Sequence, residues 1–237
     1  MQISGSVALV TGANRGIGRR FATQLLQRGA VKVYAAARDP RRVDIPGVIP
    51  LQLDITDPTS VAAAAAAAPE VTLLVNNAGI STGTNLVTGD LGKIRLEMDT
   101  HYFGTLSVVR AFAPRLAANG GRAIVNVLSA LSWFSYDGVN AYAAAKAAQW
   151  SLTNGIRLKL TAQHTQVTGV HVGAVDTDLM AGYDGPKIDP DDVARAALDG
   201  VEAGQLEVLV DDWSAMIKAA LAGDPAAFYT PGVTTSP

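Results

Sequence analysis

Short runs of apolar residues recur along the chain and alternate with longer segments in which apolar positions follow a helical period. Each run stops at a polar or turn-forming residue, as strands that are buried on both faces do. The runs occupy residues 7–10, 31–36, 48–53, 71–75, 123–128, 167–172 and 207–210. The helical segments occupy residues 16–28, 58–68, 90–118, 141–162 and 190–203. This alternation predicts an α/β domain with a doubly wound, parallel sheet of seven strands.

Two segments depart from the simple pattern. Pro50 lies inside the third apolar run, and because proline cannot donate to a strand ladder, we expect that strand near an edge of the sheet. Residues 224–237 are rich in Pro, Thr and Gly, so we expect a tail that is loose or ordered only against a partner subunit. We therefore expect residues 1–237 to form one domain with this tail at its end.

Composition narrows the class of protein. Apolar residues make up 49% of the chain and charged residues 17%, which is ample material for a core. The net charge of −2 gives no basic footprint for nucleic acid. The lack of cysteine excludes a disulfide scaffold, a zinc-thiolate site and thiol catalysis. No apolar run approaches the ~18 residues of a membrane span, and no charged leader precedes an apolar stretch. We expect a cytoplasmic protein with no metal site.

A glycine-rich segment, TGANRGIG at 11–18, joins the first strand to the first helix. Gly12 would let the chain turn sharply out of the strand, Gly16 would let backbone approach a pyrophosphate, and Gly18 would let helix and strand pack closely. The helix N-terminus would offer free N–H groups to the phosphates. The order of strand, turn and helix predicts a dinucleotide site, whereas the segment alone would also suit a tight turn without ligand.

The end of the second strand should meet the adenosine ribose of such a ligand. Ala37 leaves room there, Arg38 offers a guanidinium fork, and Arg15 in the glycine turn adds a second cation. Because arginine pairs well with phosphate, we expect NADP rather than NAD. The alternative is that Asp39 accepts from the ribose hydroxyl, as in NAD enzymes, and that Arg38 is a solvated surface charge.

Three side chains form a candidate catalytic group. Tyr142 and Lys146 are four residues apart, which places both on one face of a helix. A nearby ammonium lowers the pKa of a phenol from about 10, so Tyr142 is a candidate general acid and base. Ser129 lies at the end of the fifth strand, where open α/β sheets place their ligands. Its hydroxyl could bind a substrate carbonyl oxygen beside Tyr142, although each residue alone would also suit a structural role.

Together these features resemble the short-chain dehydrogenase/reductase family, over about residues 7–210. The matching pieces are TGANRGIG at 11–18, Asp54, NNAG at 76–79, Ser129, the Tyr142/Lys146 pair and residues 173–177. The resemblance implies a single Rossmann-type domain that transfers a hydride between a nicotinamide cofactor and a carbonyl compound or alcohol.

The resemblance also implies roles along the cofactor. Asp54 and Ile55 would lie near the adenine, and Lys146 would bind the nicotinamide ribose. Val175 and Thr177 would hold the carboxamide or phosphate side. The complete set of residues expected at the cofactor is Gly12, Asn14, Arg15, Gly16, Ile17, Gly18, Arg38, Asp54, Ile55, Asn76, Ala78, Gly79, Tyr142, Lys146, Val175 and Thr177.

The chain departs from the family pattern at two positions. His101 stands where the family usually has an asparagine that helps seat a water in a proton path. His101 either takes part in a relay to Tyr142, with a pH step near its ordinary pKa of about 6.5, or acts only as a spacer at a helix bend. Val172 stands where the family usually has a proline, and this change should affect loop stiffness alone.

The substrate is not determined by these motifs. Several large side chains could line a mostly apolar pocket, namely Leu131, Trp133, Phe134, Tyr136, Met180 and Tyr183. Trp133 and Phe134 could instead pack in a subunit contact. The short lid segment, residues 178–189, should leave the site open.

Our leading hypothesis is an NADP(H)-dependent reductase or dehydrogenase for ketones and secondary alcohols. Imine reduction, epimerisation or dehydration on the same machinery is a second hypothesis, and a nucleotide sensor without turnover is a third. The resemblance implies a homodimer or homotetramer, with the helices at 90–118 and 141–162 at the contact.

Overall fold

Seven parallel strands form one sheet in the order β3-β2-β1-β4-β5-β6-β7, as the alternation of apolar runs and helical segments predicts. The computed structural model describes residues 1–229. The strands are β1 Val7–Thr11, β2 Lys32–Ala37, β3 Ile49–Gln52, β4 Leu73–Asn76, β5 Ala123–Val127, β6 Gln166–His171 and β7 Glu207–Leu209. The strand that carries Pro50 is β3, which lies at one edge of the sheet.

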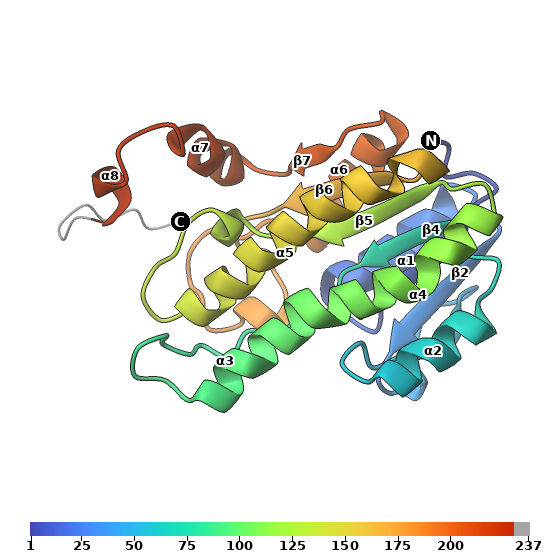
Figure 1. Ribbon diagram of the computed structural model, residues 1–237, viewed down its shortest axis with the longest axis horizontal. Helices are drawn as coiled ribbons and strands as arrows, with labels where there is room; N and C mark the ends of the chain where they lie inside the picture. The colour runs from blue at the N-terminus through green and yellow to red at the C-terminus, as the bar shows by residue number, and fades with distance from the viewer. Residues whose placement is uncertain (230–237) are drawn as a thin grey trace.

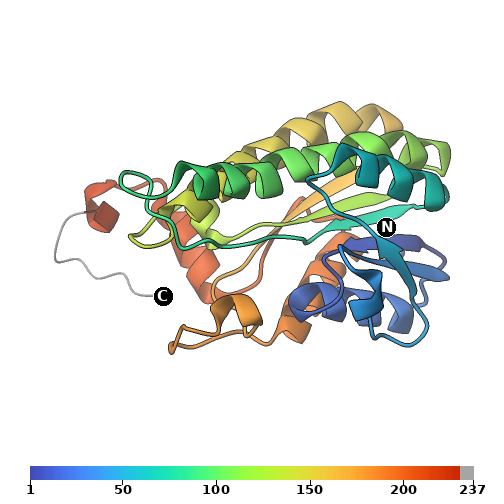
Figure 2. The same cartoon turned by 90° about the horizontal axis from the view of Figure 1, so that it is seen from below.

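Helices cover both faces of the sheet, which gives a three-layer domain. Figure 2 shows α2, α4 and α5 on one face and α1 with α6 on the other. The helices are α1 Gly16–Gln27, α2 Pro58–Ala67, α3 Leu91–Met98, α4 Thr105–Ala118, α5 Asn140–Leu160, α6 Pro190–Glu202, α7 Asp212–Ala220 and α8 Ala226–Tyr229 (Figure 1). Each face has its own apolar core. Phe21 and Leu198 lie in the core under α1 and α6, and Phe112 and Ile156 lie in the core under α4 and α5.

The strand order reverses at the centre of the sheet, and this reversal positions the site. β1 pairs with β2 on one side and with β4 on the other. From β1 the chain continues through β2 and β3 to one edge of the sheet, and from β4 it continues through β5, β6 and β7 to the other edge. The connections after β1 and β4 therefore diverge, and a crevice opens above the carboxyl ends of these two strands. Turns that follow β1, β4, β5 and β6 therefore converge on one place.

The segment expected as one helix at 90–118 is divided in the structure. α3 ends at Met98, a π-helical stretch follows over Asp99–Gly104, and α4 begins at Thr105. π-helical turns inside α-helices are frequent at functional sites. His101 lies inside this stretch and is buried.

The C-terminal part contains two helices that the apolar pattern did not reveal. α7 begins after Asp211, whose side chain accepts from the backbone N–H of Ser214. α8 covers part of the segment expected to be a loose tail, and the remainder of that tail, 230–237, lies outside the described residues. None of the helices in the described residues is long and apolar enough to cross a membrane.

Candidate active site

The glycine turn has the backbone geometry that its sequence predicts. Gly12 and Gly16 have φ values of +66° and +51°, a backbone region that residues other than glycine rarely adopt. A Cβ atom on Gly18 would lie 2.3 Å from the carbonyl oxygen of Gly12, so only glycine lets α1 pack this closely on the turn. The Asn77 amide secures the turn by donating to the carbonyl oxygens of Thr11 (3.0 Å) and Gly12 (3.3 Å).

A single pocket of about 560 Å³ lies above the turn and reaches the candidate catalytic residues. Most of the residues expected at a cofactor line it. These are Gly12, Asn14, Arg15, Gly16, Ile17, Arg38, Asp54, Ile55, Ala78, Gly79, Tyr142, Lys146, Val175 and Thr177.

Two of the expected cofactor residues do not line the pocket. Gly18 is buried beneath the turn and has a packing role. Asn76 is the last residue of β4, where its side chain donates to Asn126 at 2.8 Å inside the sheet. The next residue, Asn77, lines the pocket in its place. The reason is the pleat, because successive residues of a strand point to opposite sides.

Arginine side chains gather where the adenosine half of a dinucleotide would lie. Arg38 and Arg42 both line the pocket, and neither forms an ion pair within the described residues. Asp39, the alternative ribose ligand, accepts instead from the Arg41 guanidinium at 2.8 and 3.0 Å. That bidentate contact lowers the pKa of Asp39.

The other charges at this end also have partners. Arg15 reaches across the pocket to Asp178 with an N–O distance of 2.8 Å. Asp54 accepts from the backbone N–H and the hydroxyl of Thr56 at 3.0 and 2.7 Å. Burial alone would raise the pKa of Asp54, but these bonds and the charge of Arg38 lower it.

These residues fit a dinucleotide cofactor. Gly12, Asn14 and Gly16 of the glycine turn line the pocket at the N-terminus of α1, where phosphate binds well. Two unpaired guanidinium groups stand near the end of β2. At the far end, Lys146 in its charged form has three hydrogens on Nζ and uses two of them for protein acceptors. The third remains for a ligand hydroxyl.

Ser129 is held at the end of β5 by short-range contacts. Its Oγ accepts from the Leu131 N–H at 3.1 Å and donates to the Val172 carbonyl oxygen over 3.4 Å. The long second bond leaves the hydroxyl able to turn toward a substrate oxygen. Val172, where the family has proline, thus supplies an acceptor to Ser129 through its backbone.

Tyr142 and Lys146 project from α5 toward Ser129, as their spacing predicts. Lys146 Nζ lies 5.7 Å from the centre of the Tyr142 ring and donates to the Val127 carbonyl oxygen and to Gln149 Oε1, both at 2.9 Å. Gln149 in turn donates to Thr105, which begins α4. Gln149 was missed by sequence reasoning, although it lies one turn beyond Lys146 on the same helix.

The pKa of Tyr142 differs from the expectation. We expected the ammonium to lower it, but burial raises the pKa of Tyr142 despite its hydrogen bond with Ser129. Burial also lowers the pKa of Lys146 to about 7, so a large fraction of this lysine is neutral at neutral pH and attracts the phenolate less. Tyr142 is therefore a protonated phenol at neutral pH, which suits a proton donor.

His101 lines the pocket, and its ring meets the Tyr142 ring edge-on at 5.2 Å. Nε2 lies 2.8 Å from the carbonyl oxygen of Ile80, so Nε2 carries the hydrogen and Nδ1 is a bare acceptor. Nδ1 has no partner among the described residues. Glu97, one turn earlier and equally buried, places a carboxylate oxygen 3.4 Å from Nε2. Burial and the charge of Lys146 lower the pKa of His101.

A second buried histidine supports Ser129 from behind. His171 Nδ1 lies 3.1 Å from the Ser129 carbonyl oxygen, which only accepts, so Nδ1 is the donor. Nε2 lies 3.4 Å from Glu207 on β7, which is ion-paired with Lys218 on α7. Trp133 stacks on the His171 ring at 3.7 Å. Burial lowers the pKa of His171 to about 3. No local signal marked His171, because it lies within an apolar run.

The side chains expected around a substrate separate into two groups. Leu131, Tyr136 and Met180 line the pocket, whereas Trp133, Phe134 and Tyr183 do not. Trp133 and Phe134 pack against aromatic rings of their own chain. Trp213 on α7, which sequence reasoning missed, also lines the pocket.

The chain matches the model of the short chain dehydrogenase family over residues 6–186. A short chain dehydrogenase from Burkholderia cenocepacia, solved in complex with NADP, is 39% identical, with a TM-score of 0.93 over 98% of this chain and 100% of that one. A 3-ketoacyl-(acyl-carrier-protein) reductase from Brucella melitensis, solved with NADH, is 26% identical, with a TM-score of 0.81 over 87% of this chain and 96% of that one.

Curated relatives agree with the solved structures. A short chain dehydrogenase of Monascus purpureus is 31% identical over 84% of this chain and 72% of that protein. An uncharacterised oxidoreductase of Staphylococcus saprophyticus is 29% identical over 84% and 92%. The fold and the pocket define an oxidoreductase of the dehydrogenase type. The chain belongs to the short chain dehydrogenase family.

Proposed function

We propose that this protein transfers a hydride between NADP(H) and a ketone or secondary alcohol. The observation that carries the proposal is the meeting of Ser129, Tyr142 and Lys146 in the pocket that also contains the glycine turn. A sensor that only binds nucleotide would not need a hydrogen-bonded serine and tyrosine in front of a buried lysine. The reacting carbonyl would lie between these groups and the nicotinamide end of the pocket.

The choice of NADP over NAD is supported by charge at the ribose position. Arg38 and Arg42 are free to bind a 2′-phosphate, whereas Asp39 is occupied by Arg41 and by a backbone N–H. The complex of the Burkholderia relative with NADP supports the same choice by similarity.

In the direction of reduction, Tyr142 would donate its phenolic proton to the carbonyl oxygen. The bound cofactor would supply the hydride. Ser129 would donate a hydrogen bond to the same oxygen, which stabilises the negative charge that develops there. The raised pKa of Tyr142 keeps the proton on the phenol until the substrate oxygen becomes basic enough to take it.

Lys146 has two tasks in this arrangement. Its bonds to Val127 and Gln149 fix the ammonium beside the ring of Tyr142, where positive charge stabilises the phenolate left after proton transfer. Its third hydrogen would bind a ribose hydroxyl. Because its pKa is about 7, the charge on Lys146 changes near neutrality, and an anionic ligand in the pocket would favour the charged form.

The Tyr142→Phe variant tests this mechanism. It keeps the ring but removes the proton, so turnover should fall by ~10²-fold or more while NADPH binding persists. Tyr102→Phe is the matched control, because it loses the same hydroxyl outside the pocket lining. Turnover is followed by NADPH absorbance with a panel of ketones. A Tyr142→Phe protein that works at the parental rate would contradict the mechanism.

A further inference from the structure

The pocket has two halves with different chemistry. In the half near the glycine turn, charged side chains come from that turn and from the ends of β2 and β3. Two charged side chains come from elsewhere: Asp178, which is paired with Arg15, and Lys146 on α5. The other half surrounds Ser129 and Tyr142, and apart from Lys146, which is bonded to Val127 and Gln149, the described residues that line it are uncharged. Its apolar lining consists of Ile80, Leu96, Leu131, Tyr136, Val139, Leu179, Met180 and Trp213.

Large apolar side chains at this end remain open to water. Leu96, Tyr136 and Leu179 are 47%, 38% and 49% exposed, although all three line the pocket. Apolar side chains that gather around the mouth of a pocket mark a place where an apolar ligand binds. A carboxylate or phosphate group on the substrate would find no positive partner among these side chains.

One wall of this half is an aromatic cluster built on Phe134, which is 5% exposed. Two rings that line the pocket, Tyr136 and Trp213, each lie 6.4 Å from the Phe134 ring. Phe228 and Tyr229 contact the same ring at 5.3 and 5.6 Å. Phe134 is therefore the shared support of the pocket rings and of the C-terminal rings.

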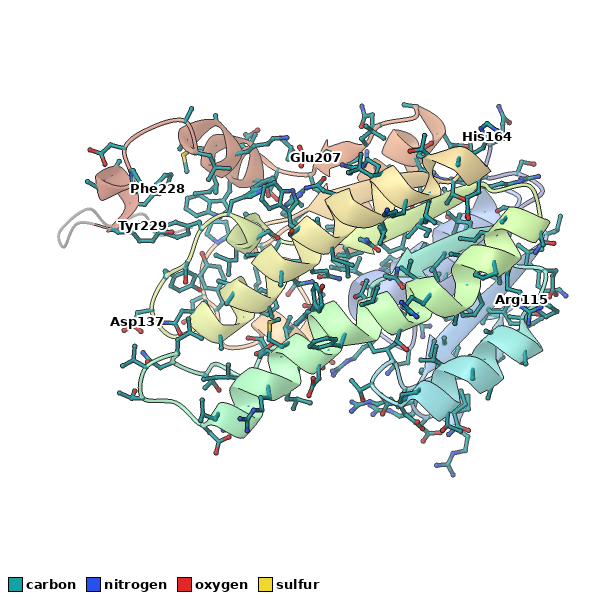
Figure 3. All side chains as sticks on the ribbon, viewed as in Figure 1. Arg115, Asp137, His164, Glu207, Phe228 and Tyr229 are labelled. Carbon is teal, nitrogen blue, oxygen red and sulfur yellow. The ribbon has the colours of Figure 1, made fainter. Side chains whose placement is uncertain are left out.

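The C-terminal helix α8 is tied to this wall by a hydrogen bond as well. The backbone N–H of Ser135 donates to the Tyr229 hydroxyl at 3.3 Å. Figure 3 shows Phe228 and Tyr229 on α8. In the sequence, this helix is far from the loop that precedes α5. α8 thus holds the loop at 133–139, which supplies two apolar side chains, Tyr136 and Val139, to the pocket.

We propose that the preferred substrates are neutral ketones with a bulky apolar group, an aromatic ring above all, and that α8 sets this preference by supporting the Phe134 wall. The proposal rests on the function proposed above. The carbonyl would face Ser129 and Tyr142, and the apolar group would lie against Tyr136 and Trp213. Aromatic rings gain from edge-on and offset contacts with such side chains beyond the area that they bury.

Two matched pairs of ketones test the substrate class. 4-Phenyl-2-butanone and 2-butanone share an unconjugated methyl ketone and differ in the ring. Methyl 4-acetylbenzoate and 4-acetylbenzoate differ in a charge remote from the carbonyl. We expect kcat/KM with NADPH to be at least about tenfold higher for the first member of each pair, as one or more aromatic contacts would give. Equal values within a pair would overturn the assignment of substrate class.

The Phe228→Ala/Tyr229→Ala double variant tests the role of α8. We expect kcat/KM for 4-phenyl-2-butanone to fall by about tenfold. The kcat/KM for 2-butanone and the Kd for NADPH should change by less than about twofold. Leu221→Ala is the control, because it removes an exposed apolar side chain that lies between α7 and α8. Equal losses for both ketones, or no loss for either, would overturn the role of α8.

A binding measurement separates this proposal from the proposed function. Trp213 lines the pocket, so 4-phenyl-2-butanol should quench tryptophan fluorescence to saturation in the presence of NADP, and 2-butanol at the same concentrations should not. Trp213→Phe should remove that change. Saturable quenching without turnover of any ketone would overturn the proposed function and support the apolar site. Quenching that does not distinguish the two alcohols would overturn the apolar site.

Discussion

Replacing Arg38 with leucine should weaken the use of NADPH much more than the use of NADH. Arg38 lines the pocket, carries no ion pair within the described residues, and is close enough to Asp54 to lower the pKa of that carboxyl. Its guanidinium is therefore placed at the adenosine end and is available to a 2′-phosphate. NADH lacks that phosphate and loses no contact.

The magnitude follows from the number of cations at this end. A hydrogen bond to a charged group contributes ~1.5–3 kcal/mol, which corresponds to about 10- to 150-fold in affinity. Arg42 lines the same end and would keep part of the attraction, so Arg38→Leu alone should lie near the lower limit. Adding Ala37→Asp places a carboxylate at a position that is only 5% exposed, where it repels a phosphate and accepts from a ribose hydroxyl.

Parallel kinetics with NADPH and NADH at one fixed ionic strength measure the effect, because salt screens exposed charges. Arg20→Leu is the matched control, since it removes the same charge from an exposed position on α1 outside the pocket lining. The double variant should prefer NADH. A parent protein that already prefers NADH, or an Arg38→Leu variant that loses both cofactors equally, would refute the reasoning.

Two further predictions concern the buried histidines. If His101 relays protons, the wild-type rate should show an acidic step below pH ~6.5, because burial and Lys146 lower its pKa, and His101→Asn should erase that step. Superimposable profiles from pH 5 to 9 would leave His101 as a spacer. Burial lowers the pKa of His171 to about 3, so below pH ~6.5 the unfolded chain takes up a proton that the folded chain refuses. As the pH is lowered below ~6.5, the free energy of unfolding of the parent should therefore decrease by about 1.4 kcal/mol per pH unit more than that of His171→Leu, as measured by urea unfolding. Equal pH slopes for the two proteins would mean that Glu207 keeps His171 protonated in the folded state.

The strand pattern, the glycine turn and the spacing of Tyr142 and Lys146 could be predicted because each follows a local rule. An apolar run between turn residues is typical of a strand buried on both faces, as β1, β4 and β5 are, and the positive φ values of Gly12 and Gly16 require glycine. The four-residue spacing places two side chains on one helix face whatever surrounds the helix.

Other features depend on which segments meet, and the sequence pattern was wrong or silent there. Asn76 and Asn77 are adjacent in the chain, but only the partners of β4 decide that Asn76 faces Asn126 and that Asn77 faces the pocket. The long helix expected at 90–118 contains a π-helical stretch that places His101 beside Tyr142. The aromatic wall joins Ser135 to Tyr229, which are 94 residues apart.

The charge states of the site are the clearest case of this dependence. The i,i+4 spacing favours a lowered pKa for Tyr142, yet burial raises it and moves Lys146 toward neutrality. This burial arises because α4, α5, β5 and the π-helical segment together exclude water from around Tyr142 and Lys146. A motif states which groups are neighbours on a helix, whereas the energy of a charge depends on every element that displaces its solvent.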